Sequence, residues 1–196
     1  MLARAITVGV AMLVGAVPAT AQQRGTMDFG AFASYTSFDH SLRMNSSLGA
    51  GGRIGMFVFP RLSVEFEGGG SRAGRTLGLQ AVNVGILAAR LTVVPLKLGG
   101  VSVLLGAGVE HMDTYFFESY GVNGLLGAKV ALSHTVALRI DGIESFEAHH
   151  KYMNMGLHLG LSVYLHPDGK QPQLPPRSGP IPSVPAQTRA CRPAAE

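Results

Sequence analysis

Apolar residues occupy every second position in the segment NMGLHLGLSVYLHP, which covers residues 154–167. The residues between them are small or neutral, and none is Lys, Arg, Asp or Glu. A period of two predicts a β-strand with two unlike faces. A strand in a soluble sheet normally carries charged side chains on its solvated face, so we expect the apolar face of this strand to meet lipid. That face consists of Met155, Leu157, Leu159, Leu161, Val163 and Leu165.

Seven further segments alternate in the same way, so the sequence predicts eight strands. The predicted strands cover residues 27–37, 47–58, 62–71, 79–93, 101–111, 120–131, 135–144 and 152–165. The connections at 59–61 and 133–134 are tight turns, and the one at 94–100 is somewhat longer. The other connections, around residues 38–47, 70–78, 112–120 and 144–152, are longer and more polar. Short turns at one end and longer loops at the other are typical of outer-membrane barrels.

Strands can cross a membrane only as a closed barrel, because every backbone N–H and C=O must be paired within the protein. Eight strands enclose a narrow interior that side chains fill, and small inward residues suit it. The sequence therefore predicts an all-β fold, an eight-stranded antiparallel up-and-down transmembrane β-barrel. The even strand number predicts periplasmic termini and extracellular loops. The alternative is a soluble barrel of the lipocalin kind, which would need charged outward residues that strands 101–111 and 152–165 do not offer at their centres.

The composition agrees with contact to lipid. Charged residues make up 14% of the 196 residues, against roughly 25% in a typical soluble domain. The single cysteine, Cys191, excludes an intrachain disulfide and a zinc site of the Cys-x-x-Cys kind. No Arg/Lys stripe with interleaved aromatic residues is present, so nucleic acid is not expected as a partner.

Two segments flank the predicted barrel domain, which covers residues 22–166. Residues 1–21 have the layout of a secretory signal peptide: one positive charge, an apolar stretch and the small-x-small triplet ATA before the expected cleavage point. Residues 167–196 are rich in proline and have almost no apolar periodicity. We expect this segment to be an extended or disordered periplasmic tail.

Residues 27–166 resemble the small eight-stranded outer-membrane barrels of the OmpA/OmpX type. The resemblance rests on GAFASYTSFD near the mature start, RIGMFVFPRLSVEFEGGGS across the second and third strands, GAGVEH in the fifth and HLGLSVYL in the last. It implies an outer-membrane location, with outer-membrane lipid, lipopolysaccharide and the barrel-assembly machinery as partners. The tail resembles the hinge that precedes a peptidoglycan-binding domain in longer relatives, and we expect no such domain here.

The last motif is similar to the signal that the barrel-assembly machinery reads. The residues that would form this signal are His158, Gly160, Val163 and Leu165. Val163 and Leu165 stand where aromatic residues are more usual, and the strand is followed by the Pro-rich segment instead of ending the chain.

Eight charged residues lie well inside the predicted strands, four of them basic and four acidic. They are Arg53, Glu65, Glu67, Arg90, Glu110, Lys129, Arg139 and Asp141. Most fall opposite the apolar set of their strand, although Val82, Val84 and Ile86 share the face of Arg90. Unpaired charges in a narrow lumen are costly, so we expect the two signs to neutralise one another inside.

The turns set the expected neighbours within this charged set. Pairing about Pro60 places Arg53 opposite Glu67, with Glu65 diagonal to it. Across the turn at His134, Asp141 lies diagonal to Lys129. The sequence thus predicts a barrel plugged by charge pairs that conducts poorly, and the alternative is a loosely hydrated lumen.

Candidate catalytic and metal-binding residues do not form a diagnostic pattern. His149 and His150 share a loop with two glutamates, but their spacing is not that of a known metal site. Ser145 lies near His149 in the sequence, whereas His158 and Ser162 lie about 13 Å apart along one strand and cannot touch. We expect no catalytic residues, no metal and no cofactor.

An aromatic cluster occupies the third long loop, where Tyr115, Phe116, Phe117 and Tyr120 fall close together. An aromatic girdle at the membrane boundary is the expected explanation, and a surface adhesin patch is the alternative. The sequence predicts a non-enzymatic outer-membrane barrel with a structural or surface-interaction role and an unknown surface ligand. The alternatives are a lipid A-modifying barrel enzyme, of the deacylase or acyltransferase class, and a narrow ion-conducting pore.

Overall fold

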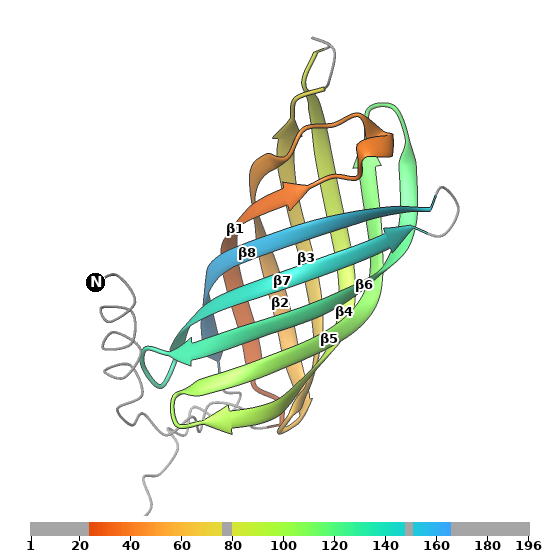
Figure 1. Cartoon of the computed structure of the whole chain (residues 1–196). Coiled ribbons are helices and arrows are strands. Elements are labelled where there is room, and N and C mark those ends of the chain that lie inside the picture. The colour runs from red at the N-terminus through yellow and green to blue at the C-terminus, as the bar shows by residue number, and fades with distance from the viewer. Residues whose placement is uncertain (1–23, 76–79, 148–150, 166–196) are drawn as a thin grey trace, which may run out of the picture.

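The computed structural model describes residues 24–75, 80–147 and 151–165. The predicted signal peptide and the predicted Pro-rich tail lie outside the described residues. The described chain forms one closed barrel in which each strand pairs antiparallel with its sequence neighbours and β1 pairs with β8 (Figure 1). The prediction of an all-β, eight-stranded antiparallel up-and-down barrel is confirmed.

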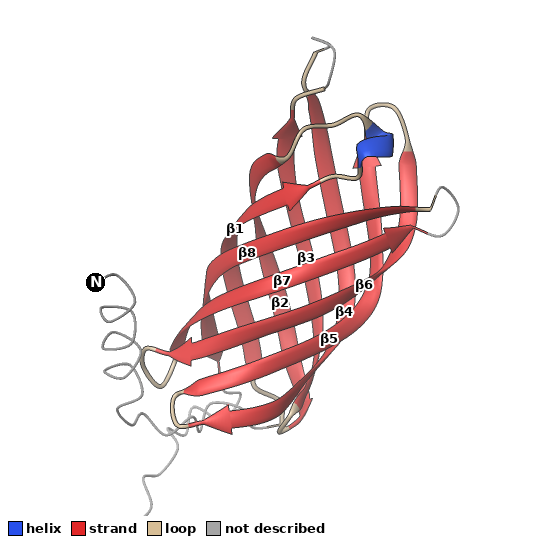
Figure 2. Cartoon of the chain, in the orientation of Figure 1, coloured by secondary structure: helices blue, strands red, loops and turns tan. Residues whose placement is uncertain are grey.

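All eight predicted segments form strands, with two of them matching the predicted bounds at both ends. The strands are β1 Met27–Ser37, β2 Ser47–Phe59, β3 Leu62–Ala73, β4 Val82–Leu98, β5 Val101–Thr114, β6 Glu118–Ala131, β7 Val136–Glu147 and β8 Tyr152–Leu165. A short 3-10 turn, η1 His40–Leu42, lies in the loop between β1 and β2 (Figure 2).

The fourth strand differs most from the prediction, which ended it at residue 93. β4 continues to Leu98, and its pairing with β5 shifts register between Val93 and Leu96. Pro95 lies in this irregularity, where a strand tolerates a residue without an N–H. The connection that was expected to span residues 94–100 is therefore reduced to Gly99 and Gly100. Gly99 has φ 57°, a left-handed conformation that suits glycine in so tight a turn.

The loop between β5 and β6 is also shorter than predicted, because both strands extend past their expected ends. Only Tyr115, Phe116 and Phe117 connect them. The Thr114 hydroxyl accepts hydrogen bonds from the N–H groups of Phe116 (3.3 Å) and Phe117 (3.1 Å) and donates one to the Phe117 carbonyl (2.9 Å). One side chain thus supplies the hydrogen bonds that close this loop.

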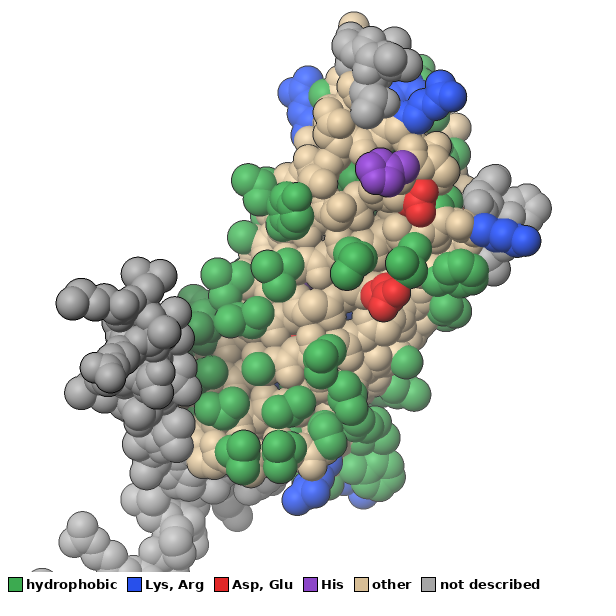
Figure 3. Space-filling model, viewed as in Figure 1, with side chains coloured by type: hydrophobic (Ala, Val, Ile, Leu, Met, Phe, Trp, Pro, Cys, Tyr) green, Lys and Arg blue, Asp and Glu red, His purple; other side chains and the backbone are tan. Residues whose placement is uncertain are grey.

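The alternation of each strand separates inward from outward side chains. The six apolar residues of β8 are between 41% and 58% exposed, whereas Ser162 and Tyr164 are buried. In β4, Val82 and Val84 lie inside with Arg90, and Leu87 and Leu91 lie outside. Hydrophobic side chains cover much of the visible flank, and Lys and Arg lie near the ends of the strands (Figure 3). An apolar outer surface of this extent is unfavourable in water.

The two ends of the barrel differ. Short connections follow β2, β4 and β6 at one end, which we call the turn end. Met27 pairs with Leu165 there, so the two ends of the barrel segment meet at the turn end. The connections that follow β1, β3, β5 and β7 lie at the opposite end, called the loop end. Within the described ranges, no helix has the length and apolar character of a membrane span.

Candidate functional site

The inward side chains form successive layers from the turn end to the loop end. An apolar cluster begins at the turn end with Phe57, Val94, Leu104, Ala137 and Tyr164, and it extends to the middle of the barrel with Leu125 and Ile143. Charged side chains lie beside and beyond it, followed by a layer of neutral polar groups. A second apolar cluster lies at the loop end and consists of Phe38, Met44, Ala73, Val84, Met112 and Tyr152.

Arg139 is the centre of the charged layer. Its Nη1 and Nη2 donate to the two oxygens of Glu65 at 3.1 and 2.9 Å. Its Nε donates to Asp141 at 2.7 Å, and Arg53 donates to the same carboxylate at 2.6 Å. All four side chains are at most 3% exposed. Because each carboxylate meets a guanidinium in the dry interior, the charges compensate one another, as a buried network requires.

Two further ion pairs extend this network. Lys129 pairs with Asp28, and its Nζ lies 5.3 Å from the ring centroid of Tyr164 in the apolar cluster. Arg90 pairs with Glu67, with Nη1 and Oε2 3.1 Å apart. Asp28 was not among the predicted residues. Its place between Met27 and Phe29, on the opposite parity of β1, was the signal that could have identified it.

The predicted strand register is confirmed, but the ion pairs that form are different from those it suggested. Arg53 stands opposite Glu67 in the ladder, yet its guanidinium pairs with Asp141. Asp141 is diagonal to Lys129, yet Lys129 pairs with Asp28. The barrel is narrow enough for long side chains to reach the far wall, so ladder neighbours do not determine the partners.

Glu110 stands apart from the other charged residues that were predicted to lie in the lumen. Its Oε2 accepts hydrogen bonds from the hydroxyl of Ser145 at 2.8 Å and from the amide of Asn123 at 3.3 Å. Asn123 in turn accepts from Arg90 Nε at 2.8 Å, so a neutral amide connects Glu110 to the nearest cation.

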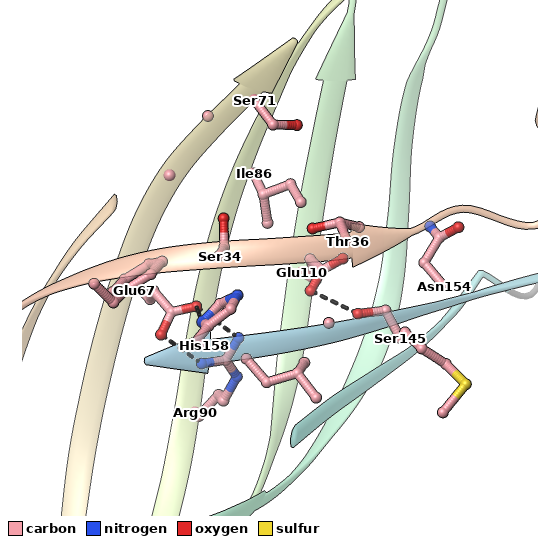
Figure 4. A pocket seen from close by; sticks show the side chains of 16 residues that line it. Ser34, Thr36, Glu67, Ser71, Ile86, Arg90, Glu110, Ser145, Asn154 and His158 are labelled. Atoms are coloured by element: carbon pink, nitrogen blue, oxygen red, sulfur yellow. Dashed lines mark hydrogen bonds and ion pairs between the residues drawn. The ribbon is translucent and has the colours of Figure 1, made fainter. Parts of the chain in front are cut away.

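A small chamber lies between the charged layer and the loop-end cluster (Figure 4). His158 enters it from β8, with its Nδ1 3.4 Å from Glu67 and its ring stacked 4.3 Å from that of Phe32. Ser145, Asn154 and Glu110 also line the chamber. Its volume of about 40 Å³ is enough for a few water molecules.

The candidate catalytic pairs are not assembled among the described residues. The Ser145 hydroxyl donates to Glu110, and His158 contacts Glu67 and Phe32. Both His149 and His150 lie outside the described residues. The part of the chain that is described contains no group of three or more His, Cys, Asp or Glu arranged to hold a metal ion.

The residues of the proposed assembly signal divide between the two faces of β8. His158 and Gly160 point inward, and Val163 and Leu165 point outward with 41% and 54% of their surface exposed. A Cβ on Gly160 would lie 2.3 Å from the Ala31 carbonyl oxygen, so this close approach of β1 requires glycine.

The aromatic residues expected to form a girdle have three different environments. Tyr120 points outward from β6 and stacks on His111 at 4.5 Å. Phe117 packs against the loop-end cluster, and Tyr115 and Phe116 lie in the loop itself. The expectation of one girdle is therefore wrong for Phe117, which packs inward, and it stays a prediction for the other three.

The fold is shared with known outer-membrane proteins. The N-terminal β-barrel domain of OprF from Pseudomonas aeruginosa is 14% identical, with a TM-score of 0.55, over 74% of this chain and all of that chain. This chain has the fold of the small outer-membrane β-barrels. The outer membrane protein OprG from Pseudomonas aeruginosa is 12% identical, with the same TM-score, over 74% of this chain and 98% of that chain.

Sequence comparison adds nothing to this structural likeness. No family model matches the sequence, and no curated protein is significantly similar to it. The predicted resemblance to small eight-stranded outer-membrane barrels is thus confirmed at the level of the fold. At these identities the likeness shows the arrangement of the strands and does not extend to the side chains inside the barrel.

Proposed function

We propose that this protein is an integral outer-membrane barrel with a closed interior and a structural or surface-interaction role, and not an enzyme. The observation that carries the proposal is the filled lumen. Arg53, Arg139, Glu65 and Asp141 form a compensated, almost fully buried network, with one apolar cluster beside it and a second at the loop end. An ion crossing this interior would have to break buried ion pairs and enter apolar layers, both of which are costly.

The apolar outer surface supports the membrane location. Leu157, Leu159 and Leu161 lie at the centre of β8 and are each about half exposed. Outer-membrane lipid, including lipopolysaccharide, is the partner that would cover such a surface. In this proposal the barrel-assembly machinery inserts the chain, and His158, Gly160, Val163 and Leu165 form the signal it reads.

We place the loop end outside the cell and both termini in the periplasm. Support comes from the short connections at the turn end, which is where outer-membrane barrels have their periplasmic turns. In a Cys191→Ser background, the Tyr115→Cys variant should react with an impermeant maleimide on intact cells. The Arg61→Cys variant should react only after the outer membrane is opened. The reverse labelling pattern would contradict this orientation.

Planar-bilayer conductance of the refolded protein tests the closed interior. We expect the wild type to conduct poorly and the double variant Arg53→Ala with Glu67→Ala to conduct better, because both residues occupy the lumen. The matched control is Ile54→Ala with Phe66→Ala, the adjacent pair in the same ladder, which points outward. A large, stable conductance in the wild type would favour the alternative of a narrow pore.

A lipid A-modifying enzyme is the alternative from another functional class. A nucleophile in such an enzyme needs a base within hydrogen-bond reach. Ser145 lies on the inward face of β7 and donates to the Glu110 carboxylate, and no histidine in the described residues contacts it. Incubation with lipid A, followed by mass spectrometry, should show no loss or gain of acyl chains.

A further inference from the structure

A hollow of about 480 Å³ lies at the loop end, separate from the small chamber inside the barrel. We call it the rim hollow. Leu42, Arg43, Met44, Arg75, Phe116 and Phe117 line it, and they come from three different loops. Its size is within the range of small-molecule sites in proteins.

The loops around the rim hollow are fixed by backbone contacts. Met44 and Arg75 form an isolated antiparallel bridge, and the Asn45 N–H donates to the Gly74 carbonyl at 2.8 Å. Arg43 has a left-handed backbone (φ 52°), and its N–H caps η1 by donating to the His40 carbonyl. The third loop is closed by the Thr114 hydroxyl. The first and second loops are therefore joined to each other, and the third is fixed on its own.

Both charged residues that line the rim hollow are arginines, and no carboxylate lines it among the described residues. The nearby carboxylate of the first loop, Asp39, accepts hydrogen bonds from the backbone N–H groups of Ser41 and Met153. Two arginines and several apolar side chains thus line the rim hollow.

The contact between Arg75 and Phe116 indicates how a ligand would be held. The Arg75 guanidinium lies over the Phe116 ring, 4.6 Å from its centroid. Stacking uses the face of the guanidinium and leaves its N–H groups directed outward in the plane, where they suit a phosphate or carboxylate. Phe116, Phe117 and Met44 provide apolar surface next to that donor edge.

The rim hollow belongs to the barrel mouth and not to the outward flank. Val82, Thr114 and Tyr152 also line it, and all three are buried residues on the inward faces of their strands. A molecule arriving from beyond the loop end therefore meets the rim hollow directly, whereas a lipid lying along the outer wall does not.

We propose that the rim hollow binds a soluble organic anion, a phosphate or carboxylate attached to an aromatic or alkyl body. Arg75 holds the anionic group, and Phe116, Phe117 and Met44 cover the body. This inference rests on the proposed function in one respect only, which is that the loop end faces outside the cell and the ligand arrives from there. Binding to refolded protein is measured without reference to that side or to conductance, so either proposal can fail alone.

The test is calorimetric titration of the protein in phosphatidylcholine nanodiscs with naphthyl phosphate, inorganic phosphate and uncharged naphthyl glucoside. We expect naphthyl phosphate to bind more than tenfold tighter than either of the others. Arg75→Gln should weaken its binding at least tenfold. Arg61→Gln, which removes an exposed arginine at the turn end, should leave binding unchanged. Slower gel migration after boiling confirms that each variant has folded.

Phe116→Ala provides a second variant that leaves both arginines in place. It should weaken naphthyl phosphate binding and leave any inorganic phosphate binding unchanged. Equal binding of the three compounds, or equal binding by wild type and Arg75→Gln, would overturn the proposal. Loss of naphthyl phosphate binding when phosphatidylglycerol partly replaces phosphatidylcholine would mean that membrane headgroups fill the rim hollow, and would also overturn it.

Discussion

The two halves of the barrel interior are filled by different kinds of contact, although the same eight strands enclose both. Toward the turn end, Arg139 bridges Glu65 and Asp141 through charge-assisted hydrogen bonds of 2.7–3.1 Å. Toward the loop end, Glu110 accepts hydrogen bonds from neutral donors, and an apolar cluster closes the barrel. The first half depends on exact charge compensation, whereas the second does not.

This difference determines what each half can tolerate. A buried ion pair that loses one member leaves an uncompensated charge in a dry interior, so the turn-end half should be intolerant of substitution. The loop-end half contains residues contributed by loops, such as Met44 and Phe117, together with a chamber large enough for a few water molecules. Loops accept sequence change more readily than the strands they join. We expect variation in ligand or partner to be confined to the loop end.

The largest expected effect is that of Arg139→Ala. The substitution leaves Glu65 without its two guanidinium hydrogen bonds and Asp141 with Arg53 alone. Removal of one partner from a buried network costs about 3–5 kcal/mol. Urea unfolding of the barrel in lipid vesicles would measure the loss.

Arg61→Ala, at an exposed position in the turn after β2, is the control and should change the free energy of unfolding by less than about 0.5 kcal/mol. Similar values for the two variants would show that the network does not stabilise the barrel.

A second prediction compares two lumen carboxylates directly, Glu65, which is buried, and Glu110, which is partly exposed. Glu65→Gln removes the charge that faces Arg139 and should cost about 1.5–3 kcal/mol. Glu110→Gln should cost less than about 1 kcal/mol. Both of the donors to Glu110, Ser145 and Asn123, reach the same oxygen, and an amide oxygen placed there keeps both bonds. The same urea measurement applies to both variants. A larger cost for Glu110→Gln would remove the distinction between the two halves.

The wall of the barrel could be predicted from the sequence because alternation is a local signal. Each strand is buried on one face only, so the apolar set of β8 indicates its face without knowledge of its neighbours. The errors in the predicted strand bounds fall where the structure depends on pairing with a neighbouring strand and not on the local pattern. The fourth strand was predicted to end at residue 93, although an irregular register keeps Pro95 and the residues after it within β4.

The pairing inside the lumen could not be predicted in the same way. Alternation correctly placed Arg53, Glu67 and Asp141 inside, since parity alone decides the face. Which of them touch depends on the reach of long side chains across the closed barrel, which is a property of the three-dimensional arrangement. The rim hollow was missed for a related reason, because Arg43, Arg75 and Phe116 come from three loops with no common sequence motif.

A smaller effect on stability is expected at the turn end of β8, where the assembly signal is proposed. Val163→Asp with Leu165→Asp places two charges on the outward face near its edge, which should cost at most about 1 kcal/mol each. The level of the protein in the outer membrane should nevertheless fall severalfold, because the signal is altered.

The matched control for this double variant is Phe29→Asp with Met27→Asp. These residues pair with Val163 and Leu165 in the ladder, so they lie at the same depth on the neighbouring strand. If both double variants lowered the outer-membrane level equally, the loss would reflect charge in the membrane and not a signal in β8. Quantitative immunoblotting of outer-membrane fractions gives the comparison.

The smallest expected effect concerns Asp39, which fastens the first loop to β8 at the loop end. Its Oδ1 accepts from the Ser41 N–H at 2.8 Å and its Oδ2 from the Met153 N–H at 3.2 Å, while its own N–H donates to Asn154. The backbone hydrogen bond from Ser41 is the main reason that the pKa of Asp39 lies below its ordinary value of 3.8. A carboxyl group with a lowered pKa stabilises the folded loop above the ordinary value and loses that contribution as the pH falls through the folded-state pKa. We therefore expect the first loop to loosen only in acid below about pH 4.

In NMR spectra of the refolded protein, the Ser41 amide should titrate with a midpoint below 3.8, and Asp39→Asn should abolish that titration. A midpoint at or above 3.8, or a titration that survives the substitution, would show that the carboxylate does not fasten this loop.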